Sequence, residues 1–137
     1  YAVSPIRLDL IEDRGLAESN IFATAMANDG GVWAGSLGSG MFRITAGDHV
    51  ERFNESDGLP GPNIWGVGVT PEQAVFALPL RGGVWQFDPD TRRFARLELP
   101  DGLNQARLRS LSVDAEGRLW LAGSEGAWQR TRSAQGE

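Results

Sequence analysis

Acid–base and metal chemistry have few candidate residues in this chain. The 137 residues include one histidine, His49, and no cysteine, which excludes a thiolate site, a cysteine nucleophile and a multi-histidine metal site. His49 follows a Gly-Asp turn, whereas general acid–base catalysis requires a histidine positioned against a partner in a pocket. Asp88 and Asp90 lack the glycine and the distal glutamate of an EF-hand loop. We therefore expect no catalytic residue, no metal site and no cofactor.

Binding chemistry has better candidates. Asn20 and Asn63 occupy the same place in two units of an internal repeat, and their side-chain amides donate hydrogen bonds to a polyol or a carboxylate. Arg81 and Arg107 are planar cations that pair with carboxylates. Trp65 offers a flat ring on which a sugar or another planar ligand stacks. These five residues form the candidate site for a small-molecule or oligosaccharide ligand.

Each candidate also has a purely structural interpretation. The two asparagines can bond the backbone of a turn, and isolated arginines are usually solvated. Trp65 can serve as a packing residue between sheets. The binding hypothesis therefore depends most on Arg81, Arg107 and Trp65, because their residue types break the repeat pattern.

The charge of the chain restricts its partners. Thirteen arginines oppose eighteen carboxylates, which gives a net charge of −5 at pH 7. Phosphate binding needs a basic face, so nucleic acid is excluded as a partner. No apolar run approaches the roughly 20 residues of a membrane-spanning helix, and we expect no membrane insertion by this segment. Hydrophobic residues make up 41% of the chain, which is enough for a folded core.

The elements that position these candidates follow from an internal repeat. Three Gly-Leu pairs stand 43 and 44 residues apart: Gly15-Leu16, Gly58-Leu59 and Gly102-Leu103. Eighteen positions after each of these glycines, an aromatic residue follows an aliphatic one: Trp33, Phe76 and Trp120. Matches in register without a gap over eighteen positions do not arise by chance. We expect Trp33 and Trp120 to pack in the core, together with the aromatic residues of the third strands: Phe42, Trp85 and Trp128.

Each unit is predicted to contain four short antiparallel strands. The first strands cover residues 21–27, 64–70 and 108–114. The second strand carries the recurring aromatic position, a glycine-rich loop precedes the third, and turns such as Asp88-Pro89-Asp90-Thr91 precede the fourth. Four strands per unit at a period of 40–50 residues favour an all-β fold of four-stranded β-propeller blades, in about three repeats.

The first strand of each unit has one bulky and one small face, because successive side chains point to opposite sides. In the second unit the bulky residues are Trp65, Val67 and Val69, and the small ones are Gly66 and Gly68. The other units repeat the pattern, with Phe22, Thr24 and Met26 opposite Ala23 and Ala25, and Leu111 and Val113 opposite Ser110 and Ser112. We expect the bulky face of one unit to pack on the small face of another.

The repeat divides the chain into an incomplete unit and three blades. Residues 1–14 are expected to hold the outer strand of a preceding blade, because residues 6–10 resemble the stretches before Gly58 and Gly102. The blades are predicted at residues 15–57, 58–101 and 102–137, the last without its fourth strand. Three blades do not close a ring of the usual four to eight. We therefore expect a fragment of a larger propeller, which associates with the remaining blades or with a second copy of the chain.

Three groups of residues carry a likeness to a known repeat family: Gly58-Leu59-Pro60 with Asn63-Ile64, Val32-Trp33-Ala34-Gly35-Ser36 with Gly40-Met41, and Asp114 with Gly117-Arg118-Leu119-Trp120. In these residues the sequence resembles the two-component regulator propeller repeat. The likeness spans residues 6–131. The second unit departs from the pattern most, because Phe76 replaces the tryptophan and Leu78-Pro79 replaces a Gly-Thr step.

The resemblance implies a seven-bladed propeller in the periplasmic or extracytoplasmic sensory part of a bacterial signal-transduction receptor, ahead of a histidine kinase or a diguanylate cyclase. We accordingly expect a non-catalytic, ligand-binding sensor segment. One alternative is a scaffold propeller whose exposed loops bind protein partners. Another is an enzyme similar to streptogramin lyase, which the single histidine disfavours because that chemistry needs histidine, acidic residues and a divalent metal.

Overall fold

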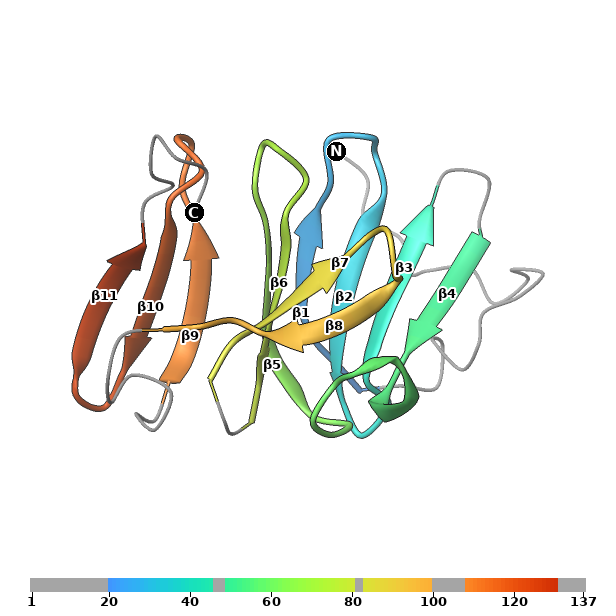
Figure 1. Ribbon diagram of the computed structural model, residues 1–137, viewed down its shortest axis with the longest axis horizontal. Coiled ribbons are helices and arrows are strands. Elements are labelled where there is room, and N and C mark those ends of the chain that lie inside the picture. The colour runs from blue at the N-terminus through green and yellow to red at the C-terminus, as the bar shows by residue number, and fades with distance from the viewer. Residues whose placement is uncertain (1–19, 46–48, 81–82, 100–107, 131–137) are drawn as a thin grey trace.

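The computed structural model describes residues 20–45, 49–80, 83–99 and 108–130, which form three antiparallel sheets in chain order (Figure 1). The first sheet contains β1 (Asn20–Met26), β2 (Val32–Leu37), β3 (Met41–Thr45) and β4 (His49–Phe53). The second contains β5 (Ile64–Val69), β6 (Val75–Pro79), β7 (Trp85–Asp88) and β8 (Arg93–Arg96). The third contains β9 (Leu108–Val113), β10 (Leu119–Gly123) and β11 (Gly126–Arg130). The expected all-β fold of antiparallel propeller blades is confirmed.

Part of the predicted division of the chain lies outside the described residues. The strand expected at residues 6–10 is among them, as are the Gly-Leu pairs at Gly15 and Gly102. The blade boundaries therefore stay predictions.

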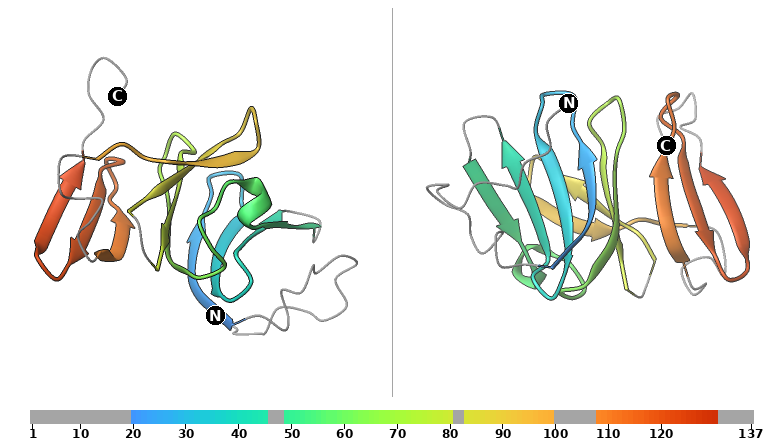
Figure 2. Two further views of the ribbon diagram at one scale, coloured as in Figure 1. Left: turned by 60° about the horizontal axis from the view of Figure 1, so that its bottom comes forward. Right: turned by 180° about the vertical axis from the view of Figure 1, so that it is seen from behind.

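The sheets stack side by side through their first strands. β1 contacts β5, and β5 in turn contacts β9. Figures 1 and 2 show the second sheet between the blue-to-cyan first sheet and the orange-to-red third sheet. In each sheet the next strands follow outward from this inner strand, in the order of the chain.

The expected packing of bulky on small faces occurs at both junctions. A Cβ atom added to Gly68 would lie 2.5 Å from Cδ2 of Leu111 and 2.9 Å from Cγ2 of Val113. The bulky face of β9 thus rests directly on the glycine face of β5. At the other junction, Ala23 and Ala25 of β1 pack against the cluster that contains Val67.

Two apolar clusters fill the spaces between the sheets. The first joins the first and second sheets around Trp33, whose ring centroid lies 5.5 Å from that of Phe53 and 5.1 Å from that of Phe87. The second joins the second and third sheets through residues of β6, β9 and β10: Phe76, Leu78, Leu108, Leu111, Leu119 and Leu121.

The recurring aromatic position has two different environments. Trp33 and Phe76 are each 3% exposed. The expected core packing is confirmed for Trp33 and for the buried Phe42, whereas Trp85 and Trp128 are partly buried. For Trp120 the same expectation is wrong, because its side chain is 40% exposed. The difference arises because the face of the second sheet that bears Phe76 is covered by β9 and β10, whereas the equivalent face of the third sheet leaves Trp120 open to solvent.

The Gly-Leu pair at Gly58-Leu59 follows the 3-10 turn η2 (Glu55–Asp57). Asn54 and Asp57 form a capping box at the start of this turn. Gly58 has a φ of 100°, and a Cβ atom there would overlap the carbonyl oxygen of Phe94. Leu59 is buried in the first cluster. Glycine is therefore required for the chain to pass close to β8, and the leucine anchors that crossing.

We predict that Gly68→Ala lowers the free energy of unfolding by about 1–3 kcal/mol, because the added methyl group overpacks the junction with Leu111 and Val113. The measurement is urea unfolding at equilibrium.

Gly66→Ala is the matched control on the same strand. Its nearest atoms would be Cβ of Leu78 at 3.4 Å and Cβ of Leu111 at 3.5 Å, which are ordinary contact distances. We expect its stability to be unchanged or slightly raised, because alanine restricts the unfolded chain more than glycine does. Equal losses in both variants would contradict the close approach of β9 to β5.

Candidate functional site

The inner strand of every sheet is interrupted by a β-bulge at the same point of the repeat. The register shifts between Ile21 and Ala23 in β1 and between Ile64 and Gly66 in β5. In β9 it shifts between Leu108 and Ser110. The inserted residues all stand seven positions after the glycine of a Gly-Leu pair: Phe22, Trp65 and Arg109. A bulge redirects a side chain out of the regular alternation, and bulges are frequent beside binding sites.

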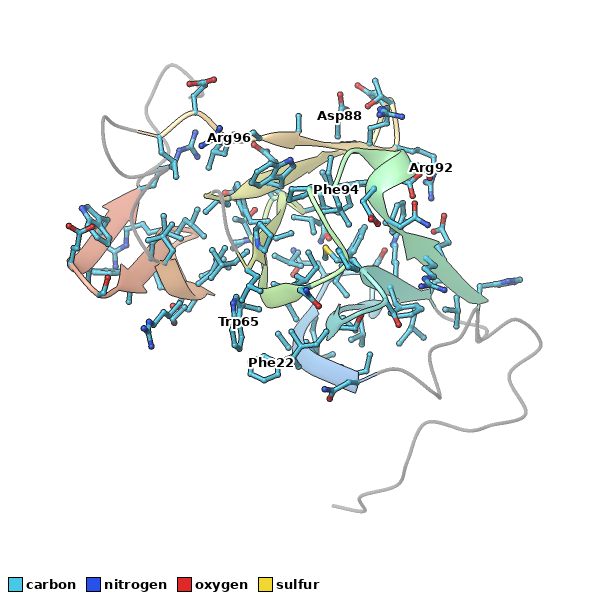
Figure 3. The ribbon with its side chains drawn as sticks, turned by 90° about the horizontal axis from the view of Figure 1, so that it is seen from below. Phe22, Trp65, Asp88, Arg92, Phe94 and Arg96 are labelled. Carbon is cyan, nitrogen blue, oxygen red and sulfur yellow. The ribbon has the colours of Figure 1, made fainter. Side chains whose placement is uncertain are left out.

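Two of these bulge residues contact one another across the junction between sheets. The ring centroids of Phe22 and Trp65 lie 4.8 Å apart at an interplanar angle of 71°, an edge-to-face contact. Phe22 is 52% exposed, whereas Trp65 is partly buried against the second cluster. Figure 3 shows the two rings side by side at the margin of the sheets, away from Arg92 and Phe94. An aromatic surface is therefore open to solvent at this junction.

The bulge corrects one detail of the expected strand faces. Simple alternation assigned Trp65 to the same face as Val67 and Val69. Instead, Val67 belongs to the first cluster and Trp65 packs against the second. The extra residue shifts the alternation by one position, so the face assigned to Trp65 was wrong while Val67 and Val69 keep theirs. The face assigned to Phe22 was wrong for the same reason, because Phe22 contacts Trp65 of the second sheet and does not share the face of Thr24 and Met26.

Asn20 and Asn63 are brought together by the backbone of β2. Asn20 pairs with Leu37 in the first sheet, and Leu37 also forms an isolated bridge with Asn63. The carbonyl of Pro62 accepts hydrogen bonds from the backbone N–H groups of Gly38 and Gly40, at 3.0 and 2.9 Å. The segment entering β5 therefore lies against the β2–β3 loop, as expected for propeller loops that emerge at one end.

Asn20 is exposed and Asn63 is half-buried. The backbone carbonyl of Asn63 accepts from the N–H of Leu80 at 3.1 Å. Within the described part of the chain, neither side-chain amide takes part in a hydrogen bond. We considered above that these two side chains hydrogen-bond the backbone of a turn. Among the described residues, no such hydrogen bond is present.

The candidate site thus joins two short segments, Asn20–Phe22 and Asn63–Trp65. Three of the five residues singled out in the sequence lie there, whereas Arg81 and Arg107 lie outside the described residues. Sequence reasoning missed Phe22 as the partner of Trp65. The sequence did hold a signal for this residue. Phe22 stands seven positions after the glycine of its Gly-Leu pair, as Trp65 does, and the residue type at this position differs in all three units. The exposed Arg109 stands at the third such position.

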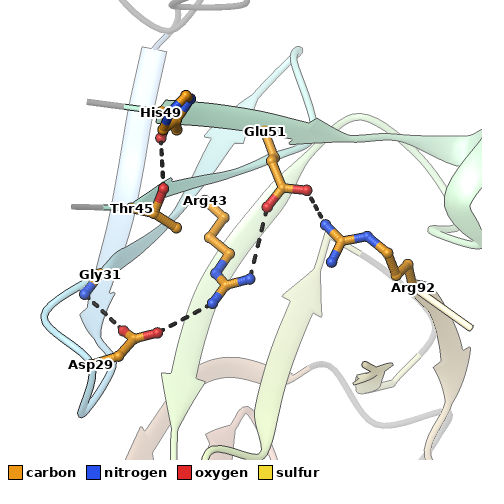
Figure 4. Close-up of polar contacts among 7 residues, drawn as sticks. All are labelled: Asp29, Gly31, Arg43, Thr45, His49, Glu51 and Arg92. Carbon is orange, nitrogen blue, oxygen red and sulfur yellow. Dashed lines mark hydrogen bonds and ion pairs between the residues drawn. The ribbon is translucent and has the colours of Figure 1, made fainter. Parts of the chain in front are cut away.

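A separate cluster of charged residues links the first sheet to the second (Figure 4). Arg43 lies 3.2 Å from Asp29 and 3.7 Å from Glu51, and Glu51 also pairs with Arg92 of the β7–β8 turn. The backbone N–H of Gly31, aided by Arg43, holds the pKa of Asp29 below its usual value. These charges pair with one another, so we interpret the group as a structural link.

His49 is the first residue of β4. Its backbone carbonyl accepts a hydrogen bond from the Thr45 hydroxyl at 3.4 Å, and its side chain is exposed. Among the described residues, no three acidic or histidine side chains are grouped to hold a metal ion. None of the described helices is long and apolar enough to span a membrane.

Asp114 organises the β9–β10 turn. Its Oδ2 accepts from Nε1–H of Trp120 at 2.8 Å and from Nε–H of Arg118 at 2.6 Å. Its Oδ1 accepts from the backbone N–H groups of Glu116 and Arg118. The hydrogen bond from Trp120, together with those from Arg118, holds the pKa of the Asp114 carboxyl far below its usual range.

Comparison with known proteins identifies relatives in fold only. No protein-family profile matches the chain, and no curated protein matches it significantly in sequence. The extracellular domain of the putative hybrid two-component system BT4673 from B. thetaiotaomicron superposes with a TM-score of 0.70 at 20% identity. That match covers 84% of this chain and 17% of the other.

Two other solved structures share the fold. Virginiamycin B lyase from Staphylococcus aureus has a TM-score of 0.66 at 12% identity, covering 88% of this chain and 40% of the lyase. YCF48 bound to D1 peptide has a TM-score of 0.64 at 21% identity, covering 85% of this chain and 38% of YCF48. The chain spans less than half the length of each of these proteins.

We predict that Asp114→Asn destabilises the fold near neutral pH, because the amide cannot replace a charged acceptor for Arg118 and Trp120. The folded-state pKa of Asp114 lies below its unfolded value, so its contribution is present above the ordinary carboxyl pKa of about 3.9 and declines below it. The stability gap between wild type and variant, measured by urea unfolding, should therefore shrink between pH 7 and pH 3.

Asp90→Asn is the control, because Asp90 is an exposed carboxylate in the β7–β8 turn. We expect no change in stability from that substitution at pH 7. A gap for Asp114→Asn that stays constant down to pH 3 would show that its carboxylate charge contributes nothing.

Proposed function

We propose that this chain is a non-catalytic, ligand-sensing segment of a β-propeller in the periplasmic or extracytoplasmic part of a bacterial signal-transduction receptor. We further propose that it belongs to the two-component regulator propeller repeats. The observation that carries the proposal is the pairing of Asn20–Phe22 with Asn63–Trp65 at one junction of sheets. The fold shared with the extracellular domain of a hybrid two-component system supports the setting.

The site suits a ligand with a flat face and several polar groups. The partly exposed rings of Phe22 and Trp65 provide a stacking surface worth about 0.5–1.5 kcal/mol. The side-chain amides of Asn20 and Asn63, which have no hydrogen-bond partner among the described residues, are proposed to donate to hydroxyl or carboxylate oxygens of the ligand. Arg81 and Arg107 are proposed to contact an anionic group of the ligand. A small molecule or an oligosaccharide has this combination of features.

A protein-binding propeller is the second candidate. YCF48, which shares the fold, was solved bound to a peptide of D1, and an exposed phenylalanine such as Phe22 also suits a peptide side chain. The lyase candidate is weaker although virginiamycin B lyase shares the fold. We propose no catalysis, because His49 is exposed and no acidic residue is recorded against its side chain in the described part of the chain.

We predict that a thermal-shift screen of oligosaccharides, sugar acids and aromatic metabolites identifies a ligand that raises the melting temperature, because a ligand bound only to the folded state stabilises it. Phe22→Leu and Trp65→Leu should each weaken the affinity for that ligand about 2- to 13-fold, which corresponds to the loss of one stacking contact. Calorimetric titration measures both affinities.

Trp85→Leu is the matched control. Trp85 is also a partly buried tryptophan, but it packs against the first cluster beside Arg96. This variant should bind the screened ligand with unchanged affinity. If the Phe22 and Trp65 variants also keep full affinity, the ligand binds elsewhere. A screen without any hit among these compounds, together with a raised melting temperature in a parallel screen of peptides, would favour the protein-binding candidate.

A further inference from the structure

Leu80 is an exposed apolar residue at the same end of the second sheet as Asn63 and Trp65. Its side chain is 43% exposed, and its backbone N–H donates to the carbonyl of Asn63 at 3.1 Å. The second sheet has a neighbouring sheet on each side. The exposure of Leu80 and the partial exposure of Trp65 therefore occur with both neighbouring sheets in place.

Each of the first two sheets presents an amide, an aromatic ring and a leucine side chain at equivalent positions of the repeat. The sets are Asn20, Phe22 and Leu37 in the first sheet and Asn63, Trp65 and Leu80 in the second. In both sets the leucine stands beside the asparagine, because Asn20 pairs with Leu37 in register and Leu80 bonds the backbone of Asn63. The proposed ligand site is therefore largely apolar, with one amide in each set.

The third sheet carries a cation in place of the ring. Arg109 is the residue inserted at the bulge of β9, and its side chain is exposed. Arg43 and Arg118 are paired with carboxylates, whereas the Arg109 guanidinium has no hydrogen bond or ion pair among the described residues. Trp65 shows that a residue at this bulge position stays partly exposed where the next sheet is packed beside it. We therefore place Arg109 at the open end of the sheets in a longer propeller as well.

The bulges of β5 and β9 lie at the same end of one junction. β9 rests on β5 in the same chain direction, because Leu111 lies beside Gly66 and Val113 lies beside Gly68. Trp65 directly precedes Gly66 in β5. The starts of the two strands are therefore neighbours.

The ring of Trp65 also packs toward the third sheet. It lies against the second cluster, which includes Leu108, the residue directly before Arg109. The junction between the second and third sheets thus brings together a partly exposed indole, an exposed leucine and a cation without a described partner.

We infer that the ligand of this site is a planar carboxylate, a flat apolar body that bears one acidic group. The flat body lies against Trp65 and Leu80, and the carboxylate pairs with the guanidinium of Arg109. The inference rests on the proposed function: it adds Arg109 to the site and narrows the class of ligand. A neutral sugar fits less well, because its hydroxyl groups lose water without gaining a hydrogen-bond partner where Leu80 and Phe22 stand.

The test titrates the full chain with 2-naphthoate and with its uncharged analogue 2-naphthamide, and follows the indole N–H signals by NMR. The Trp65 signal is the one that Trp65→Leu removes. Both probes should shift this signal. We expect 2-naphthoate to bind about threefold more tightly than the amide, which is the effect of one exposed ion pair. This preference should shrink in about 1 M NaCl, because salt screens exposed charges.

Arg109→Gln should abolish the preference for 2-naphthoate and leave the affinity for 2-naphthamide unchanged, because the flat body keeps its contact with Trp65. Arg109 is exposed, so the variant should keep the wild-type circular dichroism spectrum. Arg130→Gln is the matched control. Arg130 also has no ion pair among the described residues, but it pairs with Leu119 at the other end of the third sheet. This variant should keep the wild-type preference.

Three results would overturn the inference: equal affinities of the wild type for the two probes, a preference that persists in Arg109→Gln, or no shift of the Trp65 signal with either probe. Oligosaccharides from the thermal-shift screen whose affinity depends on Trp65 but not on Arg109 would keep the ligand site and also overturn the carboxylate class. The proposed site itself fails only if no ligand depends on Phe22 or Trp65, so the two failures are distinguishable.

Discussion

The close approach of one inner strand to the next is the contact on which the other features depend. Where β9 meets β5, the side chain of Leu111 lies so close to the backbone of Gly68 that a single methyl group on Gly68 would collide with it. The bulky face of one inner strand lies on the small face of the next, which lets the inner strands approach closely. The aromatic cluster around Trp33 fills the space between the first two sheets.

Ion pairs contribute to this arrangement in a different way. The link from Asp29 through Arg43 and Glu51 to Arg92 is partly exposed, and such pairs contribute about 0–1 kcal/mol each. The guanidinium of Arg43 also lies 5.5 Å from the ring centroid of Trp33, and that of Arg92 lies 5.9 Å from that of Phe53. The arginines therefore cover the outer rim of the first cluster with their side chains. Their side chains shield the aromatic residues from solvent, and the Glu51–Arg92 pair links the first sheet to the second.

The strands and their stacking faces could be predicted because both depend on periodicity. Side chains alternate with a period of two residues along a strand, and the blades repeat every 43 or 44 residues, so the order of residues shows both directly. It did not predict the bulges, because an inserted residue changes the register without requiring a particular side chain: the three positions carry Phe22, Trp65 and Arg109. The exposure of Trp120 was missed for another reason. Its own residue type and register match those of Trp33, and burial is decided by whether a further sheet packs on its face. Of the candidate site, Asn20, Asn63 and Trp65 were identified by position, whereas the contact with Phe22 required the bulge.

The position of the candidate site is also informative about how a signal would arise. Within each sheet, a ladder of backbone hydrogen bonds resists deformation. Between the first two sheets, the backbone contacts near the site among the described residues are the Leu37–Asn63 bridge and the two hydrogen bonds to the carbonyl of Pro62. The remaining contact there is side-chain packing, of which the Phe22–Trp65 pair is a part. The ligand proposed above would contact residues of both sheets, so it would bear on the side-chain packing between the sheets and not on the ladders within them. Such a ligand can shift an arrangement of the sheets only by its difference in affinity between two arrangements.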